Sequence, residues 1–567
     1  MPSGKVAWWQ FLTRKLFIMS YKTSTWLVLF SLLFSWTINV FAVAGDDIRA
    51  GDFSAVNFLY VSQDSASSST GRREKISYQK ASKDSTLGWQ RAQTLLLRTG
   101  FAASPDEIAH YAGLTQSAAV NQLLAGARTE AITPWPDWLR NPPTAASDYR
   151  AMSDEDKKAE REAEKLRGLD LRAWWLTEMI HTPSPLTERM TLFWHDHFVS
   201  SQQKIKISQI MARQNATLRR YALGNFGDLL HAMAKDPAML IYLDGATSKK
   251  ENPNENFARE VMELFTLGEG HYSETDIKEA ARALTGWSVE RDDYTFRLRP
   301  AWHDNGAKTI FGQTGNFDGD GVMDLLLARP ETAQFIVGKL WREFISPEPD
   351  AAEVARIAAI WRNQHYDMKS VLRELFNTPA MLDERNQATL IKSPVELLVG
   401  TIRALQIEVD DTRPLAIRAA QFGQNLFSPP NVKGWPGGEV WINSTTLLAR
   451  QQFVEQLLSM VESNRMHDAM MQAMPVADSG NKKFDQKRLL RASGSAAKWR
   501  FDAQDWLQQL GCPADAPLDA AQLAKLQQTL LVTEPVAPMT NGANGTSAAN
   551  GLVSLRRVLL DATYQVK

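Results

Sequence analysis

A short segment of the chain gathers acidic and basic side chains on one side of a predicted helix. Residues 254–267 have helical periodicity, and Arg259, Glu260 and Glu263 fall opposite the apolar stripe. Asn254 is placed to cap the start. Carboxylates around one arginine can form a buried network or a metal site, although a solvated helix face has the same composition. We expect this face to be buried, so that an Arg259→Ala change would cost several kcal/mol.

Two histidines stand near the end of another predicted helix, over residues 185–199. On a helix, His195 and His197 point about 200° from one another, so they could share one metal ion only in an extended segment. His197 falls on the same side as Phe193 and Trp194. This pattern predicts that His197 is the inward-facing histidine. A core histidine bonded to a carbonyl group is the alternative to a metal ligand.

A third histidine, His303, precedes an Asp-Asn-Gly sequence that is typical of a tight turn. Binding residues concentrate on such loops. Together His197, Glu260 and His303 would supply two imidazoles and one carboxylate, a set that suits Zn²⁺ or Fe²⁺. The sequence does not indicate whether the three side chains converge.

Residues 316–324 match several positions of an EF-hand calcium loop. Leu327 stands where such a loop has its bidentate glutamate. We therefore expect Asp320 to cap a helix instead of binding calcium.

Residues 431–443 place Trp435 and Trp441 among glycines and a proline. Such a loop either exposes its aromatic faces, on which sugar rings can stack, or plugs the helical core. We favour the plug, because the chain has 18 tryptophans and needs large aromatic side chains for its core.

Helical spacing dominates the remaining sequence, which predicts a mainly α fold. We expect a single large multi-helix body with at most a small β-hairpin, formed by residues 294–299 and 308–312. Ser104, Pro105 and Glu107 have the spacing of a capping box. The other predicted helices cover residues 89–99, 105–111, 117–124, 153–176, 208–221, 225–234, 274–285, 321–328, 330–344, 350–363, 367–376, 392–405, 412–422, 444–463 and 552–560, the last docking on the body.

The first 44 residues have the order of a secretory signal. Basic residues precede an apolar run that ends at Ala42, Val43 and Ala44. We expect cleavage after Ala44 and a periplasmic or secreted protein, with translation starting at Met1 or Met19. The alternative is an uncleaved anchor, although the apolar core is shorter than the ~20 residues of a membrane span.

The remaining organisation follows from composition. We expect residues 45–87 to form a polar, disordered leader and residues 88–567 to form the helical domain, with a loop-rich insertion near 466–550. The net charge of -1 leaves no basic footprint for nucleic acid. We expect contact with the membrane only through the signal segment. Cys512 is the single cysteine, so no intrachain disulfide can form.

Several of these strings together resemble one large bacterial group, the domain of unknown function 1800 (DUF1800) family. The resemblance covers roughly residues 89–567. It implies an exported bacterial protein, commonly encoded beside a second exported protein of the DUF1501 family, and it supplies no settled activity. The strings that carry it are residues 193–198, 242–244, 254–268, 281–287, 303–308 and 432–443.

Two functions fit these observations, and from the sequence we favour the first. The first is a periplasmic metal-dependent, hydrolase-like enzyme with His197, Glu260 and His303 as ligands, Glu263 as general base and Arg259 orienting an anionic substrate. The second is a non-catalytic binding or assembly protein of the envelope, acting on a polysaccharide or with the partner exported protein. The sequence does not decide whether the protein is an enzyme, and no phosphate loop, dinucleotide fingerprint or nucleophile elbow is present.

Overall fold

The computed structural model describes residues 85–473, 499–537 and 549–567. These residues belong to one compact unit that runs from Ser77 to Lys567. The predicted signal peptide, nearly all of the predicted leader and part of the loop-rich insertion lie outside the described residues.

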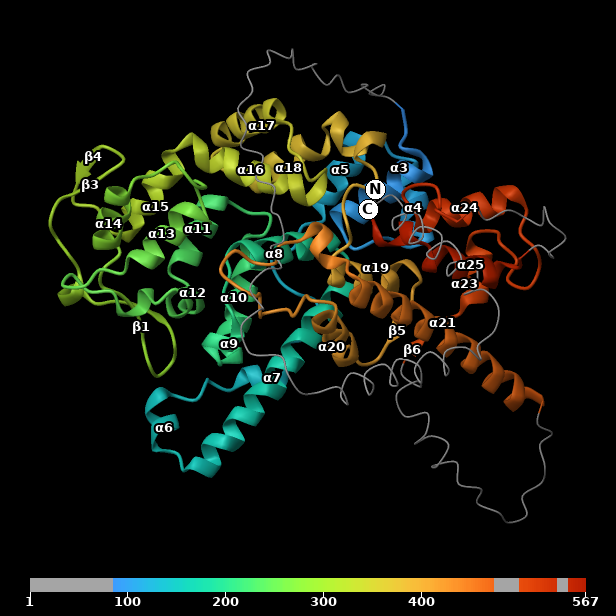
Figure 1. The fold of residues 1–567 in the computed structure, drawn as a ribbon, viewed down its shortest axis with the longest axis horizontal. Helices are drawn as coiled ribbons and strands as arrows, with labels where there is room; N and C mark the ends of the chain where they lie inside the picture. Colours follow the sequence, from blue (N-terminus) through green and yellow to red (C-terminus); the bar gives the residue numbers. More distant parts are fainter. Residues whose placement is uncertain (1–84, 474–498, 538–548) are drawn as a thin grey trace, which may run out of the picture. The chain divides into compact units, whose positions relative to one another are not determined.

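The described chain is mainly helical, as the sequence predicts (Figure 1). The elements of its first half are α3 (Gly88–Thr99), α4 (Pro105–Ala112), α5 (Gln116–Ala125), η1 (Asp137–Arg140), α6 (Ala146–Ala151), α7 (Asp154–His181), α8 (Pro185–His197), α9 (Gln202–Ile205), α10 (Ser208–Tyr221), α11 (Phe226–Ala234), α12 (Pro237–Tyr242), η2 (Gly245–Thr247), α13 (Glu255–Glu263) and α14 (Glu274–Ala283).

The second half continues with α15 (Gly319–Ala328), α16 (Pro330–Phe344), α17 (Ala351–Asn363), α18 (Met368–Phe376), η4 (Pro379–Leu382), η5 (Glu384–Asn386), α19 (Pro394–Ala404), α20 (Arg413–Gln421), η6 (Gly438–Trp441), α21 (Ser444–Ala473), α23 (Ala503–Gln509), α24 (Ala520–Leu530), α25 (Gly551–Leu560) and η8 (Ala562–Gln565). Helices α16, α17 and α18 pack consecutively against one another. The predicted docking of the last helix is confirmed, since Leu555, Val558 and Leu559 are buried.

Capping residues account for several helix starts. Ser104 and Glu107 form the predicted capping box of α4. Asn254 caps α13 by accepting a hydrogen bond from the N–H of Phe257. The prediction for the end of α13 is wrong, because the helix stops at Glu263. The chain then turns towards Gly268, whose φ of +80° lies in the left-handed region.

The β-structure consists of short antiparallel pairs. The predicted pairing of residues 294–299 with 308–312 is wrong, because each segment has a different partner. Three two-stranded sheets are present in the described residues, and each joins two strands, namely β1 (Trp287–Val289) with β2 (Phe296–Leu298), β3 (Lys308–Ile310) with β4 (Gln313–Gly315), and β5 (Glu408–Val409) with β6 (Trp499–Arg500).

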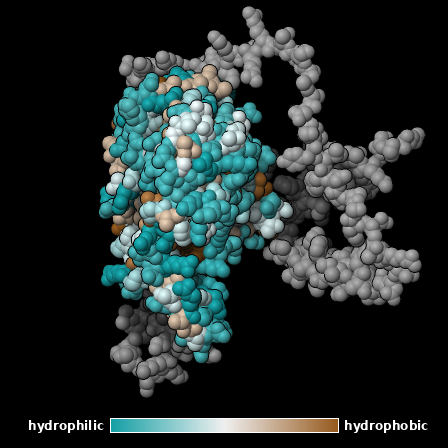
Figure 2. Space-filling model, turned by 90° about the vertical axis from the view of Figure 1, so that its left-hand side faces the viewer, coloured by the Kyte–Doolittle hydropathy of each residue, from teal (hydrophilic) through white to brown (hydrophobic). Residues whose placement is uncertain are grey.

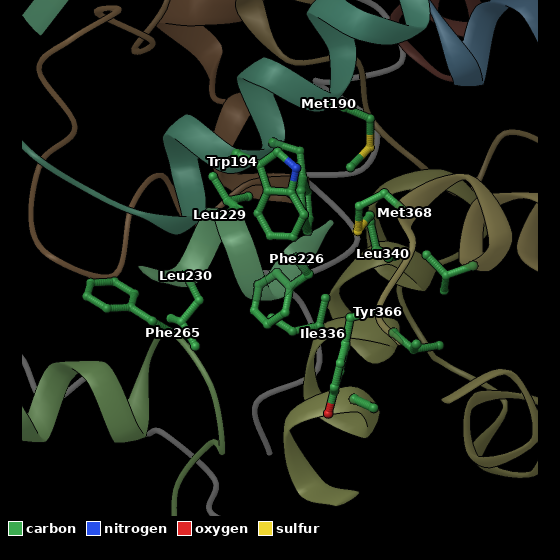
Figure 3. Packing of buried hydrophobic residues seen from close by; sticks show 14 of the residues in the cluster. Met190, Trp194, Phe226, Leu229, Leu230, Phe265, Ile336, Leu340, Tyr366 and Met368 are labelled. Carbon is green, nitrogen blue, oxygen red and sulfur yellow. The ribbon is translucent and has the colours of Figure 1, made fainter. Parts of the chain in front are cut away.

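Helix α8 contributes to both hydrophobic cores found in the described part of the chain. Met190 and Trp194 pack in the first core, and Leu192 packs in the second. Figure 3 shows Trp194 beside Phe226, with side chains of α16 close by. A helix with core on more than one side is buried around its circumference, which decides where its polar residues must find partners.

The surface has a hydrophilic character on the side that Figure 2 draws, with apolar side chains scattered over it. In the described part of the chain, no helix combines the length and the apolar character that crossing a membrane requires.

Candidate functional site

Both histidines at the end of α8 are buried. His195 is 1% exposed and His197 is 2% exposed. The prediction that His197 is the inward-facing one is therefore incomplete, because α8 has core on more than one side. Each imidazole must be satisfied by the protein interior.

His197 uses both ring nitrogens in hydrogen bonds. Lys339 Nζ on α16 donates to Nδ1 (2.9 Å), so Nε2 carries the proton and donates to the carbonyl of Phe265 (3.1 Å). Burial, and then the charge of Lys339, hold the pKa of His197 well below its usual value. The neutral imidazole thus joins α8, α16 and the turn after α13. This is the carbonyl-bonded core histidine that the sequence offered as the alternative.

Asp196 lies between the two histidines in the sequence, and its carboxylate binds a loop that is distant along the chain. Its Oδ1 accepts a hydrogen bond from the N–H of Trp435 (2.7 Å). Burial raises the pKa of Asp196 to about 7, against the opposing effects of that bond and of Lys339. Burial also lowers the pKa of Lys339 to about 8. These two groups would titrate near neutrality, and both are half-buried with a hydrogen bond to another part of the fold.

His195 is satisfied on one side of its ring. Its Nε2 accepts a hydrogen bond from the N–H of Phe427 (3.1 Å), and Nδ1 has no hydrogen-bond partner among the described residues. The ring packs against the aromatic rings of Trp175, Phe427 and Trp435. Burial lowers its pKa to about 3, so His195 is neutral. The His195 ring therefore packs where α7, α8 and the loop after α20 meet.

The polar face of α13 is not buried, contrary to the prediction. The Arg259 side chain is 35% exposed and binds both oxygens of Glu274 at 2.8 Å. Glu263 accepts a hydrogen bond from the hydroxyl of Tyr272 (2.5 Å). Glu260 is half-buried, and burial followed by the charge of Glu263 raises its pKa. Arg259 and Glu263, the predicted catalytic residues, thus each bind a neighbouring side chain.

His303 stabilises a loop against the end of α14. Its Nδ1 donates to the carbonyl of Thr285 (2.8 Å), and the N–H of Asp304 donates to the hydroxyl of Thr285 (2.8 Å). Arg282 binds the Asp304 carboxylate through Nε (2.8 Å). The hydrogen bond from Arg282, with its charge as a smaller contribution, lowers the pKa of Asp304. Two of the sequence strings, 281–287 and 303–308, therefore fold onto each other.

The predicted metal ligands are not brought together. Within residues 85–473, 499–537 and 549–567, no three His, Cys, Asp or Glu side chains form a group able to hold a metal ion. The ring nitrogens of His197 are committed to Phe265 and Lys339, while His303 is bonded to the end of α14. The set of His197, Glu260 and His303 is therefore not assembled as one site.

The segment that resembles a calcium loop caps a helix, but through a different residue than predicted. Asp318, and not Asp320, accepts the hydrogen bond from the N–H of Gly321 at the start of α15. Asp320 instead binds His231 (3.0 Å) and Lys235 (2.7 Å). The Asp320 carboxylate, in the first turn of α15, is thus directed towards α11.

The tryptophan loop plugs the core, as we favoured. Trp435 is 7% exposed and Trp441 is 6% exposed. Neither indole therefore offers a face for a sugar ring. Gly434 of the same loop lies directly on Asp196, at a φ of +84°. The loop also brings Lys433 to the surface, where Nζ lies 3.6 Å from Glu269.

A wide, open hollow lies beside the polar face of α13. Its volume is about 540 Å³. Tyr272, the partner of Glu263, contributes one aromatic ring, and Phe311 contributes another. The residues lining it are Gly270, His271, Tyr272, Ser273, Thr275, Asp276, Thr309, Phe311, Gly312 and Arg329. The Tyr272 hydroxyl connects this hollow to Glu263 at the end of α13.

The sequence analysis missed several buried charged residues. Glu188 and Arg219 form an ion pair in which both side chains are 1% exposed, with Arg219 Nε 2.5 Å from the carboxylate. Arg189 is also buried and binds Glu396 (2.5 Å). Adjacent charges inside the apolar run of α8 are a signal that could have revealed this network. Lys339 has no such signal, because its partner lies 142 residues away.

Comparison with known proteins places these features in a family without an assigned activity. A family model described as "Protein of unknown function (DUF1800)" matches residues 94–550. No curated protein matches the chain, and no solved structure matches it.

Proposed function

The chain belongs to the DUF1800 family of unknown function, and from its surface chemistry we propose that it is an exported, non-catalytic protein that binds a polysaccharide of the cell envelope. The observation that carries the proposal is the open hollow lined by Tyr272, Phe311 and short hydroxyl side chains. Its export is proposed from the signal sequence.

The lining of the hollow matches the chemistry of a sugar. A pyranose ring has apolar faces that pack on aromatic rings and hydroxyl groups that need donors and acceptors around its edge. Exposed Ser273, Thr275 and Thr309 supply hydroxyls, and Tyr272 and Phe311 supply rings. The position of Phe311 is fixed, since its N–H donates to the Asp276 carboxylate (2.7 Å).

Charges of both signs line the hollow. Asp276 and Arg329 are half-buried members of the lining. A guanidinium can donate to sugar hydroxyls or carboxylates, and a carboxylate can accept from hydroxyls. The Arg329 guanidinium lies 5.2 Å from the centre of the Phe311 ring, which orders both side chains. Such a mixed lining suits a polar glycan better than an apolar ligand.

The hydrogen bonds of the titratable groups support binding over catalysis in this proposal. His197 and His303 each bond to a backbone carbonyl. Asp196 and Lys339 have the pKa values of an acid–base pair, but both are half-buried, and each already holds a hydrogen bond within the fold, to Trp435 and His197. A substrate would have to reach those atoms for an enzymatic role, whereas the hollow is already open to solvent.

A blocking variant tests the proposal. The mature protein is mixed with insoluble peptidoglycan, chitin and cellulose, and retention on each solid is measured by sedimentation. Thr275→Trp, on the exposed start of α14, fills the hollow without removing a contact. Lys278→Trp makes the same substitution on the same helix outside the lining, and serves as the matched control.

We expect the wild-type protein and Lys278→Trp to be retained on at least one of the solids, and Thr275→Trp to be lost from it. Equal retention of the two variants would overturn the assignment of the hollow. If the wild-type protein is retained on none of the three solids, the proposed function is overturned. An exported protein of the DUF1501 family would then be the ligand to test.

A further inference from the structure

The segment before η1 is held rigidly against α7. The buried Glu178 carboxylate accepts hydrogen bonds from the backbone N–H groups of Ile132 (3.0 Å) and Thr133 (2.7 Å). The indole N–H of Trp174 donates to the carbonyl of Thr133 (3.2 Å). Charge-assisted bonds to successive amides fix the path of the chain at this point. The next residues therefore start from a defined position.

Trp135 follows directly and is the outermost ring of a stack. Its ring lies 3.7 Å from that of Trp174, at an angle of 18°. Trp174 is 5% exposed and also contacts the guanidinium of Arg219, 5.3 Å from the ring centre. Arg219 is held in turn by Glu188. The stack is buried up to Trp174 and ends in an indole that is 36% exposed.

The Trp135 side chain is ordered in the absence of a ligand. Pro134 and Pro136 stand on either side of Trp135 and restrict φ at both positions. The ring cannot turn inward without breaking its stack on Trp174. Binding a ligand to this ring therefore costs little conformational entropy, because the loop is already ordered.

The 3-10 helix η1, which follows Trp135 in the chain, is charged. Asp137 and Arg140 form an ion pair of 3.1 Å, with side chains that are 89% and 82% exposed. Ile132 is the other strongly exposed apolar side chain of this segment. A specific protein interface needs about 800 Å² from each partner with an apolar centre. A single indole followed by this charged helix is smaller and more polar than the apolar centre of a protein interface.

We propose that Trp135 is a stacking platform for a sugar ring, a second contact for the envelope polysaccharide. This inference rests on the proposed function. The indole offers a flat apolar face, while Asp137 and Arg140 can accept from and donate to the ring hydroxyls. A nucleic acid base could also stack, but the net charge of -1 gives its phosphates no basic groove to follow.

The test uses the full mature chain and the solid that retains it, or insoluble peptidoglycan when several do. Trp135→Ala removes the platform, and Trp135→Tyr keeps a stacking ring. Leu166→Ala truncates another exposed apolar side chain, 65% exposed and on α7, as the matched control. Thermal unfolding of each variant verifies that it is folded. Oxidation of Trp135 is followed by mass spectrometry with and without the solid.

We expect Trp135→Ala to bind roughly tenfold more weakly, as aromatic stacking allows, with Trp135→Tyr and Leu166→Ala close to wild type. Bound glycan should protect Trp135 from oxidation. Wild-type binding by Trp135→Ala, or oxidation of Trp135 at an unchanged rate in the bound protein, would overturn the platform. Such a result is distinct from failure of the proposed function, in which the wild-type protein itself is not retained.

Discussion

Gly434 lies so close to Asp196 that a Cβ on residue 434 would stand 2.3 Å from the Asp196 carboxylate oxygen Oδ1 and 2.6 Å from its carbonyl oxygen. The same carboxylate accepts the N–H of Trp435. Asp196 belongs to α8, and the glycine belongs to a loop that begins more than two hundred residues later. This contact is therefore the point at which two distant signature strings meet, and it requires a residue without a side chain.

Replacing this glycine should destabilise the fold. Gly434→Ala places a methyl group against Asp196 and also imposes a φ of +84° on alanine. We expect a loss of about 3 kcal/mol or more in the free energy of unfolding, measured by chemical denaturation, since the strain and the clash add. Gly270→Ala is the control, because Gly270 has a φ of +85° but no described atom within 4 Å of its Cβ position. It should cost about 1 kcal/mol. Equal losses would mean that the contact with Asp196 tolerates a methyl group.

Asp196 should make stability depend on pH. Its pKa rises from 3.8 to about 7 in the folded protein. Between these values the folded state keeps a proton that the unfolded state has lost, so stability falls as pH rises, by about 1.4 kcal/mol per pH unit, and this contribution is level outside the window. Asp196→Asn removes the titration and keeps an oxygen for the Trp435 N–H.

We therefore expect the difference between the wild-type and Asp196→Asn stability curves to slope between about pH 4 and pH 7. The difference is needed because Asp236, whose pKa burial raises to about 6, contributes a similar slope at the acidic end in both proteins. Asp228→Asn, at an exposed position on α11, serves as the control. Parallel curves for wild type and Asp196→Asn would show that Asp196 ionises normally.

Two arginines with similar-looking ion pairs should differ sharply in their effect on stability. Arg259→Ala breaks an exposed pair with Glu274 and should cost less than about 1 kcal/mol, because water screens the charges. Arg219→Ala leaves the Glu188 carboxylate buried without its partner and should cost about 3–5 kcal/mol. Urea denaturation of both variants measures the two losses. The earlier expectation of a large loss for Arg259→Ala is revised because its helix face is exposed, and a loss as large as that of Arg219→Ala would restore it.

The sequence by itself determined the structural features that depend only on residues close together in the chain. Helix positions follow from a 3.6-residue apolar period, and caps such as Ser104 and Asn254 act on amides within one turn. The ordered strings were also enough to identify the family. Each of these features needs information from no more than a few adjacent residues, so it can be read without knowing the fold.

Only the tertiary structure decided which side chains meet. Lys339 reaches His197 across 142 residues, and Gly434 reaches Asp196 across a longer interval. The sequence placed His197, Glu260 and His303 in one hypothetical site, yet packing gave each histidine its own backbone carbonyl. The exposure of α13 and the burial of both tryptophans in the 431–443 loop were set in the same way. Local periodicity fixes which face of a helix is apolar, but the partner of each buried polar group depends on how distant elements pack, because only that packing brings the donor and the acceptor within reach.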